Sequence, residues 1–284
     1  MLLQKFSPHP QFSDYIDSIL VQEDFNPVNF ANRCPVKVLP STLTVIGIQY
    51  GNRMKVVGDD KEDLLGTSGI TGLQTTVKQY LSTGSIGTII IRFKPGGLTA
   101  FTPYPIYELR DANIDLDLVF PSNLVSEMEQ KLADATNAGE RIAVVHKFLL
   151  SLLNQKKEDQ LIMQVTRQIQ QQTEALSIEQ LAREFFISKR TLERKFKTLI
   201  GISPKSFANI VRFQRAIQLR KSGLNYLDII QACNFSDHAH FANDFKAFAG
   251  CSPESFFRSE FQPELVRHFN EHRAQIPLAQ TMYQ

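Results

Sequence analysis

A short run of cationic and hydroxyl side chains between residues 189 and 195 could bind a polyanion. The run comprises Lys189, Arg190, Thr191, Arg194 and Lys195. Such side chains contact the phosphates and base edges of DNA. Cations in the first turn of a helix oppose the helix dipole, so a sequence selected only for folding would place acids there. The run therefore indicates a surface that contacts nucleic acid.

The helix that must position this run is predicted to begin after Ser188, which is a suitable N-cap residue. Its apolar side chains recur at i, i+4, i+7 and i+8, namely Leu192, Phe196, Leu199 and Ile200. A capping box at residues 177–180 predicts a shorter helix before it, and residues 186–187 form the tight turn between the two. Two short helices joined in this way are typical of a helix-turn-helix, whose second helix enters the major groove.

An internal repeat predicts a second unit of the same kind. The segment 196–207 recurs at 245–256, with seven of twelve positions identical. Both copies contain a glycine that suits the end of a helix, followed after one residue by Ser-Pro, which suits the start of the next. A chance repeat would not reproduce both signals. Two helical hairpins without a DNA-binding role are the alternative interpretation.

In the second copy, residues 228–233 are expected to supply the first helix, and Ser236 is expected to cap the second. Phe241, Phe245 and Phe248 form its predicted inner face. Its outer face carries His238, His240, Asn243 and Lys246. A helix from Ser203 to about Ser222 is expected to hold the two recognition helices about one DNA turn, roughly 34 Å, apart.

These motifs resemble the DNA-binding domain of the AraC/XylS family of transcription regulators. The segments that carry the resemblance are 181–182, 188–197 and 201–204 in the first copy and 234–237, 240–241, 245–246 and 250–253 in the second. Asn234 stands where the family usually has glycine, and Ile230 stands where it has alanine. Asparagine tolerates the left-handed conformation better than most residues, so we expect the turn to form.

The resemblance implies a cytoplasmic, dimeric regulator that binds promoter DNA through both recognition helices and senses a signal through its N-terminal half. RNA polymerase and a small-molecule effector are further partners that it implies. The implied DNA-binding residues are Lys189, Arg190, Thr191, Arg194, Lys195, His238, His240, Asn243 and Lys246. The smaller charge of the second set predicts that the first helix carries most of the sequence readout.

The N-terminal half is predicted to be β-rich. Apolar, β-branched runs at 36–39, 44–50 and 87–93 alternate with Pro and Gly, as in a small barrel or sandwich. Residues 6–10, 15–16 and 92–97 resemble a poorly characterised domain of some AraC-like regulators, which implies a cupin-like barrel with a sensory or dimerisation role. The expected fold class is therefore α+β, with an all-α C-terminal part.

Residues 122–155 change to helical periodicity. The first helix presents Leu124, Met128 and Leu132 and is expected to pack on the barrel, whereas the second could pack there or form a dimer contact. Residues 156–159 are a charged linker. The predicted boundaries are 1–121 for the sensory domain, 122–157 for the hairpin, 158–260 for the DNA-binding domain and 261–284 for a partly helical tail.

Charge and composition support this division. Residues 160–258 contain 14 Lys and Arg against 8 Asp and Glu, a net charge of +6, whereas the remainder has 17 against 21. Only the first part is therefore expected to meet a polyanion. The three cysteines are widely spaced, and the N-terminus has no signal-peptide pattern, so we expect reduced thiols inside the cell and no membrane span.

No constellation of residues predicts catalysis, a cofactor or a metal site. Cys34 has no neighbouring cysteine or histidine in the sequence, and the pair His268 and His272 lacks further metal ligands. The alternative to a DNA-binding regulator is a ligand-binding barrel whose helical half mediates protein contacts only. A DNA-repair enzyme would need a reactive cysteine that the N-terminal half does not supply.

Overall fold

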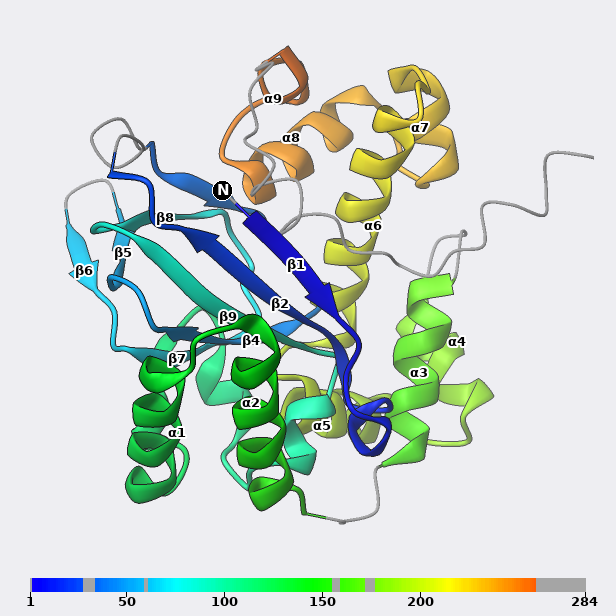
Figure 1. Ribbon diagram of the computed structural model, residues 1–284. Helices are drawn as coiled ribbons and strands as arrows, with labels where there is room; N and C mark the ends of the chain where they lie inside the picture. The colour runs from blue at the N-terminus through cyan, green and yellow to red at the C-terminus, as the bar shows by residue number, and fades with distance from the viewer. Residues whose placement is uncertain (1, 28–33, 59–60, 155–158, 172–176, 259–284) are drawn as a thin grey trace, which may run out of the picture.

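The computed structural model describes residues 2–27, 34–58, 61–154, 159–171 and 177–258. A β-rich N-terminal part and a helical C-terminal part lie next to each other (Figure 1). The expected α+β class is thus confirmed. The predicted linker residues 156–158, the tail from 261, and His268 and His272 lie outside the described residues.

The N-terminal part contains two antiparallel sheets. The strands of the larger sheet, in spatial order, are β1 (Leu2–Phe6), β2 (Ile16–Asp24), β9 (Ile86–Phe93), β4 (Thr44–Gln49), β7 (Ser68–Thr71) and β10 (Asn113–Asp115). Those of the smaller sheet are β3 (Val36–Val38), β8 (Lys78–Ser82), β5 (Met54–Val57) and β6 (Glu62–Leu64). The barrel-like expectation needs correction, because the outermost described strands pair on one side only and both sheets stay open.

Two helices, α1 (Ser122–Asp134) and α2 (Ala138–Leu152), cover one face of the larger sheet (Figure 1). Successive side chains of β4 point to opposite faces of the sheet. Ile46 and Ile48 are therefore buried on the helix side, and Val45 and Gly47 face the smaller sheet. Both helices share one apolar core with the sheet. The second helix therefore packs as the first does, and its apolar face is not available to a second subunit.

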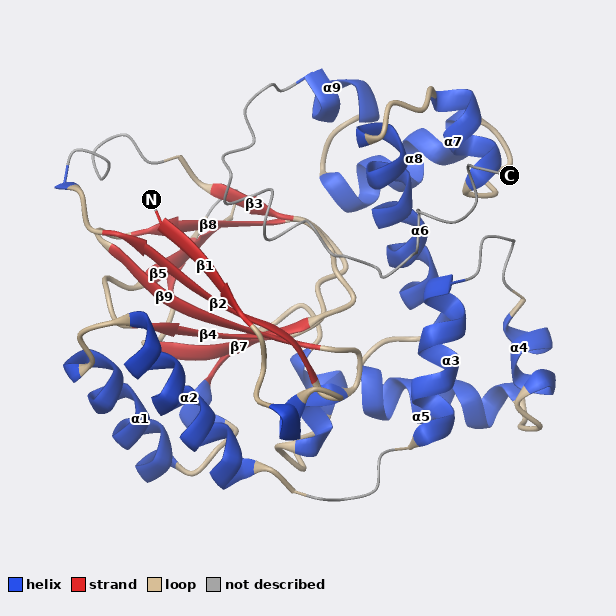
Figure 2. Ribbon diagram, turned by 45° about the vertical axis from the view of Figure 1, so that its right-hand side comes forward, coloured by secondary structure: helices blue, strands red, loops and turns tan. Residues whose placement is uncertain are grey.

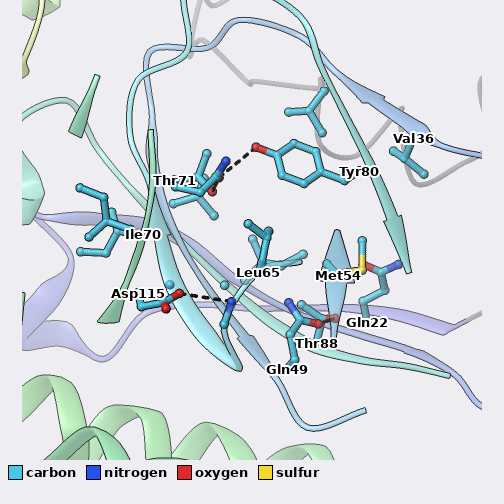
Figure 3. A pocket seen from close by; sticks show the side chains of 18 of the residues that line it. Gln22, Val36, Gln49, Met54, Leu65, Ile70, Thr71, Tyr80, Thr88 and Asp115 are labelled. Atoms are coloured by element: carbon cyan, nitrogen blue, oxygen red, sulfur yellow. Dashed lines mark hydrogen bonds between the residues drawn. The ribbon is translucent and has the colours of Figure 1, made fainter. Parts of the chain in front are cut away.

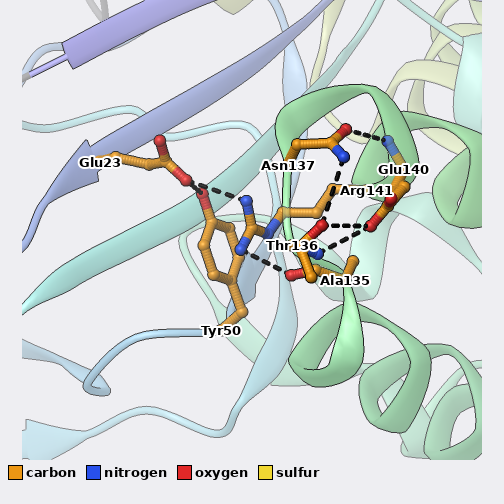
Figure 4. Close-up of polar contacts among 7 residues, drawn as sticks. All are labelled: Glu23, Tyr50, Ala135, Thr136, Asn137, Glu140 and Arg141. Carbon is orange, nitrogen blue, oxygen red and sulfur yellow. Dashed lines mark hydrogen bonds and ion pairs between the residues drawn. The ribbon is translucent and has the colours of Figure 1, made fainter.

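A buried polar cluster fastens the start of α2 to the sheet (Figure 4). Arg141 donates hydrogen bonds to Glu23 Oε1 (3.0 Å) and to the carbonyl oxygen of Ala135 (2.8 Å). Its guanidinium carbon lies 4.1 Å from the centre of the Tyr50 ring, and the Tyr50 hydroxyl donates to Glu23 at 2.8 Å. Burial, together with Glu23, raises the pKa of Tyr50. The cluster keeps the buried guanidinium paired, which a low-dielectric site requires.

The C-terminal part forms two helical modules that share one long helix, α6 (Pro204–Lys221) (Figure 2). The first module comprises α3 (Gln160–Gln171), α4 (Ile178–Glu184), α5 (Lys189–Ile200) and the first half of α6. The second comprises the rest of α6 with α7 (Tyr226–Ala232), α8 (His238–Ala249) and α9 (Pro253–Arg258). Each module has its own apolar core, as the repeat predicts.

Helix α3 was not among the predicted elements. It contributes Ile162, Val165 and Ile169 to the core of the first module, and these residues follow the i, i+3, i+7 spacing that would have revealed it. The three cysteines are free thiols, of which Cys34 is exposed and Cys233 is buried. No helix in the described part of the chain combines the length and apolar character needed to cross a membrane.

Candidate nucleic-acid interface

The caps of the first module are those that the sequence predicts. The Ser177 side chain accepts a hydrogen bond from the Gln180 amide (3.3 Å) and starts α4, and the Ser188 side chain accepts one from the Thr191 amide (3.1 Å) and starts α5. Gly201 ends α5 with φ of +96°. These signals set where the cationic run begins on α5, namely in its first turn.

The tight turns of the two modules have the same backbone geometry. Phe186 has φ of +54° and Asn234 has φ of +52°, and the two occupy equivalent places in the repeat. The expectation that Asn234 would adopt the left-handed conformation is confirmed. Phe186 does so as well, although a bulky side chain is strained there, and its side chain is 94% exposed.

Helix α5 separates the cationic run into two groups. Leu192, Phe196 and Ile200 are buried, and Arg190 and Arg194, four residues apart, lie on the opposite, exposed face. Lys189 and Lys195 lie on the flanks, where Lys189 pairs with Glu179 of α4 and Lys195 with Asp159. The hydrogen bond to Glu179 raises the pKa of Lys189. The exposed arginines are therefore the side chains best placed to reach a partner along the helix face.

The second module differs at its cap. Asp237, and not Ser236, caps α8, because its carboxylate accepts a hydrogen bond from the His240 amide at 2.7 Å. This bond lowers the pKa of Asp237. The prediction of Ser236 is wrong because the second copy has one extra residue here. The Ser236 hydroxyl instead hydrogen-bonds to Asp237 and to His240 Nδ1.

The four predicted residues of α8 do not form one cluster. Asn243 and Lys246 are exposed on the face opposite the buried Phe241 and Phe245. His240 lies against Phe235, with its Nε2 3.6 Å from Asp244, so it stabilises the turn.

His238 lies apart from this face. Its ring packs edge-on against Tyr226 of α7, and its Nε2 is 3.9 Å from Glu254 of α9. Ile230, the bulky departure from the family pattern, is buried in the core of the second module and is thus accommodated.

A groove of about 640 Å³ between the modules contains further polar residues outside the predicted DNA-binding set. Lys205, Asn209, Arg212 and Arg215 line it from α6. They are spaced four, three and three residues apart, which places them on one helix face. This spacing is visible in the sequence and could have identified them as a group. Arg212 is held in place by Asp244 at 2.6 Å and stacks 4.5 Å above the Phe235 ring.

Residues 181–259 match a family model described as a helix-turn-helix domain. The transcriptional activator RhaS of Escherichia coli is 36% identical over 74 residues, which are 26% of this chain and 27% of that protein. RhaS of Escherichia fergusonii is 37% identical over 81 residues, 28% of this chain and 29% of that protein. The resemblance carried by the two copies is thereby confirmed. The helix-turn-helix domain at residues 181–259 is of the AraC/XylS type.

A second family model matches the N-terminal part of the chain. Residues 4–115 match a family model described as a domain of unknown function, DUF6597. The matches to RhaS cover less than a third of the length of those relatives. Among solved structures, ToxT from Vibrio cholerae is 11% identical with a TM-score of 0.42, and the match covers 90% of this chain and 98% of ToxT.

Proposed function

We propose that the chain is a sequence-specific DNA-binding transcription regulator. The observation that carries the proposal is the pair of capped helix-turn-helix modules joined by one helix, each with an exposed polar face on its second helix. The net charge of +6 over residues 160–258 supports contact with a polyanion. The family match supports a regulator rather than an enzyme.

Within this proposal, α5 supplies most of the base readout. Arg190 and Arg194 face outward and would meet base edges, and Lys189 and Lys195 on the flanks would meet phosphates. Thr191 is half-buried, with its hydroxyl hydrogen-bonded to that of Ser188 at 2.9 Å, and would contact DNA beside the arginines. On α8, Asn243 and Lys246 are available for direct contact, and His238 and His240 would act at the edge of the interface. This division follows from the exposure and pairing of these side chains.

Salt dependence tests this proposal against the alternative of a ligand-binding protein whose helices mediate protein contacts only. We expect selection from random duplexes to yield a preferred site. The affinity of the full chain for that site should fall by roughly 10³-fold or more between about 50 and 200 mM salt, because binding releases counterions from the phosphates. Fluorescence anisotropy with labelled duplex measures this dependence. A failure to enrich any sequence, or an affinity insensitive to salt, would support the alternative.

The N-terminal part is proposed to modulate DNA binding through the loop between β7 and β8. Leu73 of this loop is buried in the core of the first module, and Val77 packs against the core of the second. The Val77 amide also donates a hydrogen bond to the carbonyl oxygen of Phe248 in α8 at 3.1 Å. The loop thus contacts both modules at once, in addition to the covalent connection that α6 provides.

Asp111 holds this loop in place from the N-terminal side. Its carboxylate accepts hydrogen bonds from the amide (2.6 Å) and hydroxyl (2.8 Å) of Thr75, and its own amide donates to the carbonyl oxygen of Leu73 at 3.0 Å. A change in the N-terminal part that moved Asp111 would therefore move residues that contact both modules. This route supports regulation through the N-terminal part.

Replacing Leu73 with alanine tests the contribution of the loop. We expect the free energy of unfolding in urea to fall by about 2 kcal/mol, the low end for a buried leucine, because the space between two parts of a chain can relax. Affinity for the selected site should also fall, since the modules lose a contact that orients them. Leu64→Ala, at a leucine that is 54% exposed, is the matched control. Unchanged affinity in Leu73→Ala would contradict the proposed role.

The remaining assignments follow from the family. We propose a homodimer that acts on promoter DNA in the cytoplasm and contacts RNA polymerase, in keeping with the description of the RhaS relatives as transcriptional activators. The three free thiols suit a reducing compartment. The domain boundaries at 121, 157 and 260 are likewise proposals. A small-molecule effector is the remaining proposed partner.

A further inference from the structure

A cavity of about 120 Å³ lies between the two sheets of the N-terminal part (Figure 3). Its apolar lining comes from both sheets and comprises Val36, Val38, Val45, Met54, Leu65, Ile70, Ile86, Ile90 and Ile114. Two paired glycines form part of the wall, and the space beside Gly47 is open. Gly47 of β4 and Gly69 of β7 are direct partners across the two strands, and both line the cavity. The wall therefore lacks side chains at two adjacent positions.

The polar groups of the cavity are hydroxyls, the Asp115 carboxylate and the amides of Gln22, Gln49 and Asn113. Asn113 Oδ1 accepts hydrogen bonds from Thr71 (2.9 Å) and from the Tyr80 hydroxyl (3.2 Å). Elsewhere in the lining, Gln49 Oε1 accepts one from Thr88 at 2.6 Å. The amide oxygens of Asn113 and Gln49 are thus occupied, and the N–H groups of these two amides are donors that a ligand could use.

The lining offers no positive charge. None of the described residues that line the cavity is Lys, Arg or His. Asp115 is the acidic member, is exposed, and accepts a hydrogen bond from the Gly66 amide at 3.2 Å. Burial raises the pKa of Tyr80, so this hydroxyl stays neutral at physiological pH. A carboxylate or phosphate placed here would lose its hydration without gaining a cationic partner.

We propose that this cavity binds a small uncharged organic molecule, about the size of one ring, that carries a hydrogen-bond acceptor for the amide groups of Asn113 or Gln49. The size follows from the volume, since an engineered cavity of roughly 150 Å³ accommodates benzene. Binding itself does not depend on DNA, but the identification of this molecule as the effector rests on the proposed function.

The cavity is connected to the β7–β8 loop by one hydrogen bond. The Tyr80 hydroxyl, on the cavity wall, accepts a bond of 2.6 Å from Gln74 Nε2, and Gln74 follows Leu73 in the loop that contacts both modules. A ligand that shifts Tyr80 therefore acts directly on the loop. This connection gives the uncharged ligand a route to the DNA-binding helices.

Benzamide and benzoate, which have similar shapes but differ in charge, are the probes for this proposal. With the full chain, we expect saturation-transfer NMR and thermal shift to show benzamide binding at least about tenfold more tightly than benzoate, because only the carboxylate must be buried unpaired. Comparable binding of benzoate, or no binding of benzamide, would overturn the proposal.

Filling the cavity locates the site. A Cβ atom at Gly47 would meet only Gln49 Nε2, at 3.8 Å, so Gly47→Val projects its methyl groups into the open space. We expect it to weaken benzamide binding about tenfold or more, with Gly47→Ala, which requires less space, giving a smaller loss. Gln79→Val, on β8 but outside the lining, should bind benzamide as the wild type does. Undiminished binding in both Gly47 variants would overturn the assignment of the cavity.

DNA binding, measured on the same preparations without probe, separates the two proposals. Benzamide binding without selection of any DNA sequence would support the ligand site and contradict the proposed function. Selection of a DNA site without benzamide binding would support the proposed function and contradict the ligand site. If both hold, benzamide should change the affinity of the wild type for its DNA site and leave that of Gly47→Val unchanged.

Discussion

Replacing both Arg190 and Arg194 with alanine is expected to weaken binding to the selected DNA site by roughly a hundredfold or more. The two arginines lie one helical turn apart on the exposed face of α5, opposite the buried Leu192 and Phe196. A side chain that makes a good contact to a base edge contributes about 1–3 kcal/mol of discrimination, and two such losses multiply in affinity. Fluorescence anisotropy with the selected duplex and with single-base variants measures the effect.

The pattern across DNA sequences distinguishes base contacts from phosphate contacts. Loss of a base contact relaxes specificity at one position, whereas loss of a phosphate contact weakens binding to all sequences about equally. We expect the arginine variant to relax specificity and Lys189→Ala to weaken binding to all sequences. Arg183→Ala is the matched control, because it removes the same charged group from an exposed position on α4 of the same module.

Substitutions in the second module should weaken DNA binding less. Asn243→Ala combined with Lys246→Ala removes the two exposed polar side chains of α8, and we expect a loss smaller than that of the arginine pair. His240→Ala should act differently, through the turn, because His240 contacts Phe235 and Asp244. An arginine variant that binds its site as tightly as Arg183→Ala would refute the assignment of α5 as the main recognition helix.

The helical part of the fold could be predicted from sequence because its signals are local. A serine cap, a buried face with helical spacing and a glycine stop all lie within about four turns of one another, so each copy of the repeat specifies its own helices. The cap of α8 is the exception, because local signals there are ambiguous. Two adjacent residues, Ser236 and Asp237, could each cap α8, and the geometry of the turn selects the second.

The N-terminal part was harder to predict because its organisation depends on contacts between distant residues. The runs at 36–39, 44–50 and 87–93 correspond to β3, β4 and β9, but their order in two sheets follows from pairings that no local pattern contains. The cavity illustrates this most clearly. Gly47 and Gly69 are unremarkable in the sequence, and only the register of β4 with β7 brings them together.

The division of the cationic run on α5 also required the structure. The sequence groups five residues by proximity, whereas the structure separates exposed Arg190 and Arg194 from Lys189 and Lys195, which pair with Glu179 and Asp159. The partners are 10 and 36 residues away along the chain. Contacts between the loop at Leu73 and the modules likewise join the two halves of the chain, so neither half reveals them alone.

Substitutions at two phenylalanines of the first module should change the free energy of unfolding in opposite directions. Phe196 is fully buried, and its ring packs edge-on against Phe207 with the ring centres 5.4 Å apart. Phe196→Ala is expected to lower the free energy of unfolding by about 3–5 kcal/mol, because it removes the buried ring and leaves a cavity among closely packed neighbours. Urea denaturation followed by circular dichroism measures this loss.

Phe186, only ten positions earlier, is 94% exposed and has a positive φ. Phe186→Ala removes little buried surface, so it should change the free energy of unfolding far less than Phe196→Ala does. Phe186→Gly should raise it by about 1 kcal/mol, because glycine adopts the left-handed conformation without the steric cost that a β-carbon imposes. A higher free energy of unfolding in Phe186→Gly, together with a much lower one in Phe196→Ala, would show that the module tolerates strain in its turn because its core is well packed. Equal losses at the two positions would contradict the burial and the backbone geometry on which both expectations rest.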